Sequence, residues 1–174
     1  VQVEGYDDDP LPLLLIPGLG CTAELYSGQA AAFGDDLPTA IADVTGANTI
    51  AGLARQVLDR APPRFAVAGL SMGGYICFEL WRQAPERIAK LALLDTQARP
   101  DGPPASDVRM RMIQLASEGR LDKVHEALYP RLVAPRRRDD AALETVVRRM
   151  LMEVGAPAFV RQQNAILRRA DSRP

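Results

Sequence analysis

The chain has 174 residues, of which 47% are hydrophobic and 25% are charged, and its formal net charge is −1. This length and composition predict one globular domain with a substantial core, and the near-neutral charge argues against nucleic acid or an anionic membrane as the main partner. No apolar run approaches the roughly 20 residues that a membrane-spanning helix needs, so we expect no membrane partner.

The sequence contains few signals for a cellular compartment or a cofactor. The N-terminus lacks the basic region and apolar core of a secretory signal, although a chain that begins at Val1 leaves room for a removed upstream segment. Cys21 and Cys77 do not suggest a disulfide framework, and we expect Cys77 to be a small core residue, so the cytoplasm is the expected compartment. No cluster of His, Cys, Asp and Glu has metal-ligand spacing and no GxGxxG motif opens a helix, so we expect no metal and no cofactor.

The first part of the chain alternates predicted strands and helices. After an acidic, loop-like lead-in over residues 1–10, apolar runs predict four buried strands, and amphipathic or apolar segments between them predict three helices. Asn48 or Thr49 can cap the second helix, and Pro62-Pro63 stop the chain after it. This alternation predicts an α/β fold with a parallel, doubly wound sheet whose ligands bind at the carboxyl ends of the strands. The strands are expected at residues 11–16, 39–44, 65–68 and 88–94, and the helices at 25–33, 50–58 and 72–84.

The second part of the chain is predicted to contain only helices, which follow a linker with Pro and Gly at residues 99–105. The clearest helix runs from Asp139 to Gly155, where Gly155 is its stop signal, and Pro157 suits the first turn of another helix. We therefore divide the chain into an α/β core at residues 1–98 and an all-helical cap over the sheet edge at residues 99–174.

The most informative stretch is Gly69-Leu70-Ser71-Met72-Gly73, between the third predicted strand and a long helix that is apolar on all sides. A serine at such a strand-to-helix turn sits on a strained bend, with its hydroxyl exposed at the carboxyl edge of the sheet. A Cβ at either flanking glycine would press against a neighbouring strand or helix, and Ser71 would need a positive φ. A purely structural serine is the alternative, but strain of this kind favours a functional one.

With these elements in place, the chain resembles the α/β-hydrolase fold family, in its small, esterase-like branch with a single helical cap. The resemblance rests on the strand and loop LLLIPGLG at residues 13–20, the GLSMGGY turn at 69–75 and the passage APERIAKLALLD at 84–95. It covers nearly the whole chain. The predicted strand before GxSxG and the helix after it make this otherwise common motif specific.

The resemblance implies a serine hydrolase that acts on a small ester-like substrate. Ser71 would be its nucleophile and would form an acyl-enzyme. The backbone N–H groups of Met72 and Leu19 would form the oxyanion hole. Many relatives carry His-Gly where this chain has Pro17-Gly18, a departure that should matter little because the donor is a backbone group.

The remaining members of a catalytic triad are missing from the pattern. Family members place the acid and the histidine after later strands, and no such strand is predicted here. Asp95 ends its strand near Ser71, where some members place their acid, but an aspartate that satisfies the following turn is the competing interpretation. The single histidine, His125, lies on the apolar side of a predicted helix beside Val124 and Leu128, and we expect it to be packed rather than catalytic.

The strand at residues 88–94 would form an exposed, apolar edge of the sheet, and such edges pair with other chains. We therefore expect that residues 1–174 are most of a longer hydrolase, incomplete at the C-terminus of the fold. Otherwise a partner segment or a homodimer must cover the edge.

Two further features have simple explanations. Arg136-Arg137-Arg138 is expected to be a solvated turn rather than a phosphate site. Four methionines of the predicted cap could line an adaptable acyl pocket, although helix packing is the simpler interpretation. They are Met110, Met112, Met150 and Met152.

Two functions compete with hydrolysis, because one fold hosts many chemistries. The first is a binding module that kept the fold and lost catalysis. The second is an acyltransferase that uses the same nucleophile with an acceptor other than water.

Overall fold

Four parallel strands form one sheet in the order β2-β1-β3-β4. The computed structural model describes residues 10–173, so nearly all of the predicted lead-in lies outside the described residues. The predicted parallel sheet is confirmed, with strand ends that shift by up to three residues. The strands are β1 Leu13–Ile16, β2 Thr39–Ile41, β3 Phe65–Leu70 and β4 Ile88–Leu94.

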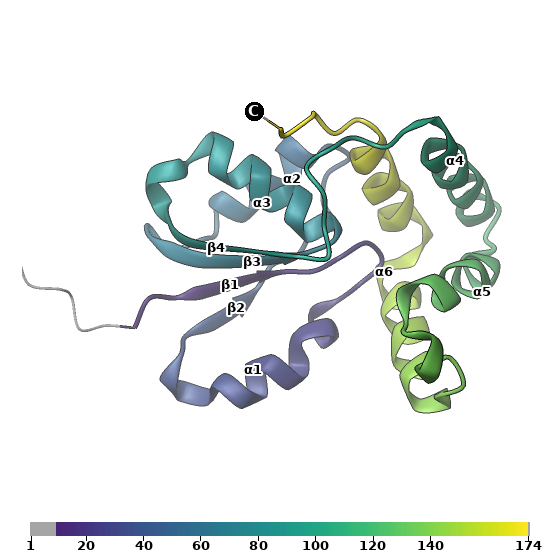
Figure 1. Cartoon of the computed structure of the whole chain (residues 1–174), viewed down its shortest axis with the longest axis horizontal. Helices are drawn as coiled ribbons and strands as arrows, with labels where there is room; N and C mark the ends of the chain where they lie inside the picture. Colours follow the sequence, from purple (N-terminus) through teal and green to yellow (C-terminus); the bar gives the residue numbers. More distant parts are fainter. Residues whose placement is uncertain (1–9, 174) are drawn as a thin grey trace, which may run out of the picture.

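Helices cover both faces of the sheet, which confirms the doubly wound arrangement (Figure 1). On one face lie α2 (Ile50–Leu58) and α3 (Met72–Gln83), and on the other lies α1 (Ser27–Phe33). Side chains of β1 alternate between these faces, because successive residues of a strand point in opposite directions. Leu14 and Ile16 pack in the core under α2 and α3, whereas Leu15 packs with Tyr26 on the opposite face.

The start of α2 follows from its sequence. Thr49 caps the helix, since its Oγ1 accepts a hydrogen bond of 3.0 Å from the N–H of Gly52. The predicted apolar spacing is also observed, because Ile50, Leu53 and Val57 are all buried against the sheet core. Both predictions for this helix are therefore confirmed.

Two glycines let the first turn of α3 lie directly against the strands. A Cβ at Gly73 would lie 2.1 Å from the carbonyl oxygen of Ile16, and a Cβ at Gly69 would lie 2.4 Å from that of Gly73. Real Cβ atoms do not approach backbone so closely, so only glycine fits either position. The steric reason predicted for the two glycines is thus confirmed.

The outer side of α3 differs from the prediction. We expected this helix to be apolar and covered all round, but Trp81 is 51% exposed. The sheet and α2 cover two sides of α3, and within residues 10–173 no further helix packs over Trp81. That expectation is wrong for this residue.

Beyond the carboxyl ends of the strands, the chain is helical (Figure 1). We call α4 (Pro103–Ser117), α5 (Leu121–Leu132) and α6 (Ala141–Leu167) the helical region. These helices share an apolar cluster of their own, in which Val124 and Phe159 are fully buried. The start of α4 falls inside the predicted linker because Pro103 suits the first position of a helix.

The third helix of this region is bent at the predicted place. Gly155 has φ of 74° and ψ of 160°, which interrupts α6, and Pro157 follows in the first turn of the second half. Asp140 caps the first half, since its Oδ1 accepts a 2.9 Å hydrogen bond from the N–H of Leu143. The second half reaches the sheet, where Ile166 packs in the core cluster with α2 and α3.

The edge strand β4 is uncovered along most of its length. Only Ile88 is buried, whereas Leu91, Leu93 and Leu94 are each about 40% exposed. The sheet order leaves one side of β4 without a neighbouring strand among the described residues. An apolar edge is therefore present, as the sequence predicts.

The close contact at Gly73 can be tested by adding one methyl group. We expect Gly73→Ala to lower the free energy of unfolding by about 3 kcal/mol or more, because the backbones of β1 and α3 must separate. Gly28→Ala is the matched control, since a Cβ there meets nothing within 4 Å and a helical Ala is favoured over Gly by about 1 kcal/mol. Urea denaturation of the complete protein measures both, and equal stability of the two variants would contradict the argument.

Candidate active site

Ser71 lies at the strand-to-helix turn between β3 and α3 with a strained backbone, at φ 53° and ψ −111°. A non-glycine residue in this region costs about 1–3 kcal/mol, which surrounding contacts must offset. Two such contacts come from the β4 side. The N–H of Ser71 donates to the carbonyl of Leu94 at 2.9 Å, and the hydroxyl of Thr96 donates to the carbonyl of Ser71 at 2.8 Å. The positive φ that the motif predicts is therefore present.

The loop after β1, residues 17–20, lies beside this turn. A Cβ at Gly18 would lie 3.4 Å from the carbonyl oxygen of Leu70 and 3.7 Å from the Cβ of Ser71. The loop is anchored from behind, because the hydroxyl of Tyr26 donates to the carbonyl of Ile16 at 3.1 Å. The two stretches singled out from the sequence thus meet at one corner of the sheet.

A buried glutamine of α6 holds the same loop. The Oε1 of Gln162 accepts a 3.0 Å hydrogen bond from the N–H of Gly20, and its Nε2 donates to the carbonyl of Val44 at 3.1 Å. The side chain is fully buried. Sequence reasoning missed Gln162, although a polar residue on an apolar helix face near Phe159 and Ile166 is the signal that could have found it.

The two predicted oxyanion donors lie on either side of this corner. Leu19 belongs to the loop, and Met72 directly follows Ser71 at the start of α3. Among residues 10–173, no backbone or side-chain oxygen accepts a hydrogen bond from the N–H of either residue. Leu19 lines the cavity described next, whereas Met72 is fully buried and does not line it.

A cavity of about 910 Å³ opens onto this corner. Its floor is the carboxyl edge of the sheet, and its walls are the helical region. The walls are mostly apolar with a few polar groups, as in sites that bind small molecules. The lining residues from the sheet side are Gly18, Leu19, Cys21, Leu25, Leu70, Ser71 and Asp95.

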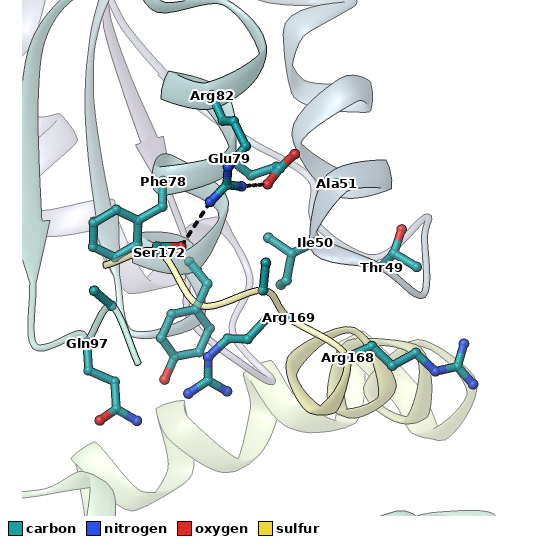
Figure 2. A pocket seen from close by; sticks show the side chains of 13 residues that line it. Thr49, Ile50, Ala51, Phe78, Glu79, Arg82, Gln97, Arg168, Arg169 and Ser172 are labelled. Atoms are coloured by element: carbon teal, nitrogen blue, oxygen red, sulfur yellow. Dashed lines mark hydrogen bonds and ion pairs between the residues drawn. The ribbon is translucent and has the colours of Figure 1, made fainter. Parts of the chain in front are cut away.

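A second cavity of about 450 Å³ lies between α2, α3 and the segment that follows α6. Figure 2 shows that Arg82 reaches Glu79 and Ser172 there, with the Nη2 of Arg82 donating to the Oγ of Ser172 at 3.2 Å. Neither Ser71 nor the loop at 17–20 contributes to it. Of the sequence-predicted site residues, Leu19, Ser71 and Asp95 line the larger cavity, and Met72 lines neither.

Asp95, the weaker candidate for the acid, also lines the larger cavity and has a positive φ of 40°. In the described part of the chain its carboxylate accepts no hydrogen bond, and the adjacent hydroxyl of Thr96 makes the contact to Ser71 instead. The structure thus brings Asp95 and Ser71 to one cavity without joining them directly.

His125 is not at this cavity. Its side chain is 5% exposed within the helical region, with its Nε2 3.4 Å from Glu144 Oε1 and its ring 5.3 Å from that of Tyr129. This buried position away from the cavity agrees with the prediction that His125 is packed rather than catalytic.

Both cysteines are free thiols. Cys77 is fully buried, as predicted, and Cys21 lines the larger cavity, where its Sγ donates to the carbonyl of Leu19 at 3.5 Å. Burial raises the pKa of the Cys21 thiol to about 11. Cys21 therefore lacks the lowered pKa that is typical of a reactive cysteine.

The four methionines of the helical region divide into two pairs. Met112 and Met150 are buried and line the larger cavity, whereas Met110 and Met152 are exposed. The first pair therefore fits the acyl-pocket interpretation as well as helix packing. The basic triplet at residues 136–138 is exposed, as predicted, and Arg137 pairs with Asp140 at 2.6 Å.

Solved structures with the same arrangement of elements are enzymes of one fold. A thermophilic esterase from Thermogutta terrifontis, with malate bound, superposes with a TM-score of 0.81 at 24% identity, over 93% of this chain and 65% of that one. An enol-lactonase from Burkholderia xenovorans gives 0.81 at 23%, over 96% and 68%, and a hydrolase from Pseudomonas aeruginosa gives 0.78 at 21%, over 92% and 67%.

These similarities show that the chain has the α/β-hydrolase fold. The chain spans about two thirds of the length of these three structures, 65% of the esterase. No protein-family model and no curated protein sequence matches it. Of the helices that the structure describes, none is both long and apolar enough to cross a bilayer.

The clamp at Gln162 gives a testable consequence. We expect Gln162→Leu to lower the free energy of unfolding by about 2–4 kcal/mol, because Gly20 N–H and the Val44 carbonyl lose their partner in the interior. Gln29→Leu on the exposed side of α1 is the control and should change stability by about 0.5 kcal/mol or less. Similar urea midpoints for the two variants would show that the clamp contributes little.

Proposed function

We propose that this protein is a serine hydrolase of ester-type substrates with Ser71 as the nucleophile. The observation that carries the proposal is the strained turn at Ser71, which opens onto an apolar cavity of about 910 Å³. Esterase, enol-lactonase and hydrolase structures with the same fold support it. In this proposal residues 99–174 act as a cap that shapes the acyl-binding part of the cavity.

The chemistry follows from these groups. The Oγ of Ser71 attacks the ester carbonyl carbon while a base takes its proton, and the carbonyl oxygen becomes an oxyanion. Backbone N–H groups of Leu19 and Met72, which have no hydrogen-bond acceptor among residues 10–173, would stabilise that charge. The alcohol leaves with a proton, and water then hydrolyses the acyl-enzyme.

The base is the part that the described residues do not supply. His125 is the single histidine of the sequence and does not line the cavity. We therefore place the catalytic histidine outside residues 1–174, and we retain Asp95 as a secondary candidate for the acid because it lines the cavity with Ser71. The proposed compartment is the cytoplasm, which the two unpaired thiols support.

A fluorophosphonate probe tests the nucleophile. It should label Ser71 of the complete protein, and Ser71→Ala should abolish labelling and lower kcat by roughly 10⁴- to 10⁶-fold. Ser27→Ala, at an exposed position of α1, should leave both unchanged. If Ser71 of the complete protein stays unlabelled, the hydrolase proposal fails and a binding module is favoured. Products that form only with added alcohol or amine would indicate acyl transfer.

We also propose that the apolar edge of β4 is covered by another strand. Leu91 and Leu93 are about 40% exposed on a strand with an open side, and Lys90 is the single charged residue of that strand. An exposed edge that is mostly apolar promotes pairing between chains. For residues 1–174 alone, the partner at hand is a second copy of the same chain.

This edge proposal predicts self-association of residues 1–174 expressed alone. The double substitution Leu91→Lys and Leu93→Lys should shift the species toward monomer, because charged side chains oppose strand pairing. Met110→Lys, at an exposed apolar position of α4, is the control and should not shift it. Light scattering after gel filtration measures the mass, and a monodisperse monomer that unfolds cooperatively without any substitution would show the proposal to be wrong.

A further inference from the structure

One face of α4 carries a charged residue into the apolar cavity. Residues spaced three and four apart on this helix line the cavity, and Arg109 lies among them with Ala105, Val108 and Met112. The side chain of Arg109 is 20% exposed, and its Nη1 donates to the Oε1 of Gln163 at 3.0 Å. The guanidinium is thus fixed at the cavity wall rather than free in solvent.

The charge of Arg109 is only partly balanced. Asp101 pairs with the Nε of Arg109 and also accepts a 2.9 Å hydrogen bond from the Nη2 of Arg169. Within residues 10–173, neither arginine pairs with any other carboxylate. One carboxylate therefore faces two guanidinium groups, and the trio carries an excess positive charge.

Proton uptake does not change this balance. Burial acts to raise the pKa of Asp101, but the hydrogen bonds from Arg169 and Arg109 lower it below its ordinary value, so the carboxylate stays ionised near neutral pH. Arg169 is 4% exposed and its guanidinium lies 4.1 Å from the centre of the Tyr75 ring. Because Arg169 is enclosed, Arg109 is the member of the trio that presents the excess charge to the cavity.

A second arginine faces the same space from another helix. Arg131 of α5 lines the cavity and, in the described part of the chain, makes no ion pair or side-chain hydrogen bond. Asp95, beside Ser71, is the acidic residue of the lining. The polar part of the helical wall is therefore positive, and the rest of that wall is largely apolar.

We propose that Arg109 and Arg131 form an anion-recognition subsite, so that the ester opened by Ser71 carries a carboxylate away from the scissile bond. A guanidinium group binds a carboxylate with two parallel hydrogen bonds, and Asp101 and Gln163 orient Arg109 before the ligand arrives. A singly charged carboxylate suits apolar walls better than a phosphate dianion, because desolvation costs rise steeply with charge. This inference rests on the proposed ester hydrolysis at Ser71.

A pair of esters that differ only at the far end provides the test on the complete protein. The para-nitrophenyl monoester of glutarate carries a terminal carboxylate, whereas para-nitrophenyl valerate carries a methyl group there. We expect Arg109→Gln and Arg131→Gln each to lower the glutarate-to-valerate ratio of kcat/KM by roughly 10- to 100-fold, the range for a hydrogen bond to a charged group. Arg136→Gln, in the exposed turn, is the charge-matched control and should leave the ratio unchanged.

If kcat/KM falls equally for both esters, so that the ratio is unchanged, the arginines act in packing and the subsite is rejected. No fall in kcat/KM for either ester would also reject the subsite. Arg109→Lys should restore part of the ratio, because a lysine keeps the charge and loses the two-point contact.

A binding measurement separates this inference from the proposed reaction. Calorimetric titration of monomethyl glutarate needs no nucleophile, so it can be performed on the Ser71→Ala protein. We expect monomethyl glutarate to bind more weakly when either arginine is replaced by Gln. On the protein that keeps both arginines, dimethyl glutarate, which has no charge, should bind less tightly than monomethyl glutarate. If binding weakens in the Gln variants while the protein with Ser71 intact shows no esterase activity, the subsite is kept and the proposed function is rejected. Equal binding of the two esters would reject the subsite.

Discussion

The contact between the first turn of α3 and the end of β1 fixes the geometry of the candidate site. At Gly73 a hydrogen atom fits where a methyl group would lie 2.1 Å from the carbonyl oxygen of Ile16. Because the loop at residues 17–20 begins directly after that carbonyl, the same contact sets how far the loop lies from Ser71. One steric constraint between backbones therefore positions Ser71 relative to the N–H groups of Leu19 and Met72. This constraint does not depend on flexible side chains.

Hydrogen bonds complete what the steric contact begins. Thr96 holds the carbonyl of Ser71 from the β4 side, and Gln162 holds Gly20 from the helical region. Each is a polar contact at a place where backbone groups would otherwise lack partners, and such losses in the interior are costly. The strain at Ser71 can persist because Leu94 and Thr96 hold its backbone and the loop at residues 17–20 lies beside it.

The sequence predicts the features that depend on neighbouring residues. Alternating apolar runs predict the four strands, the glycines around Ser71 predict its backbone, and Gly155 with Pro157 predicts the bend in α6. Each of these is a local preference of the backbone, so a short window of sequence contains the information.

Contacts between distant segments could not be predicted in this way. Gln162 bonds to Gly20 across 142 residues, and Arg169 meets Asp101 across 68 residues. Their polar side chains are compatible with either a solvent-exposed or a buried helix face, and only the packing of α6 on the sheet decides between them. The prediction that Trp81 is covered fails for the same reason. An apolar residue in the sequence does not show which elements are available to pack over it.

The bend at Gly155 separates two tasks within one helix. The half before it contributes Leu143, Val147 and Met150 to the cavity wall. The half after it carries Gln162 and Ile166 into the sheet core, and of its residues Gln163 alone lines the cavity. Protein engineers could therefore exchange the chain upstream of the bend to alter ligand choice, while the downstream turns continue to brace the amide-bearing loop. Most of the α6 positions that line the cavity would then evolve on one side of a single glycine, and the glutamine that holds the loop on the other.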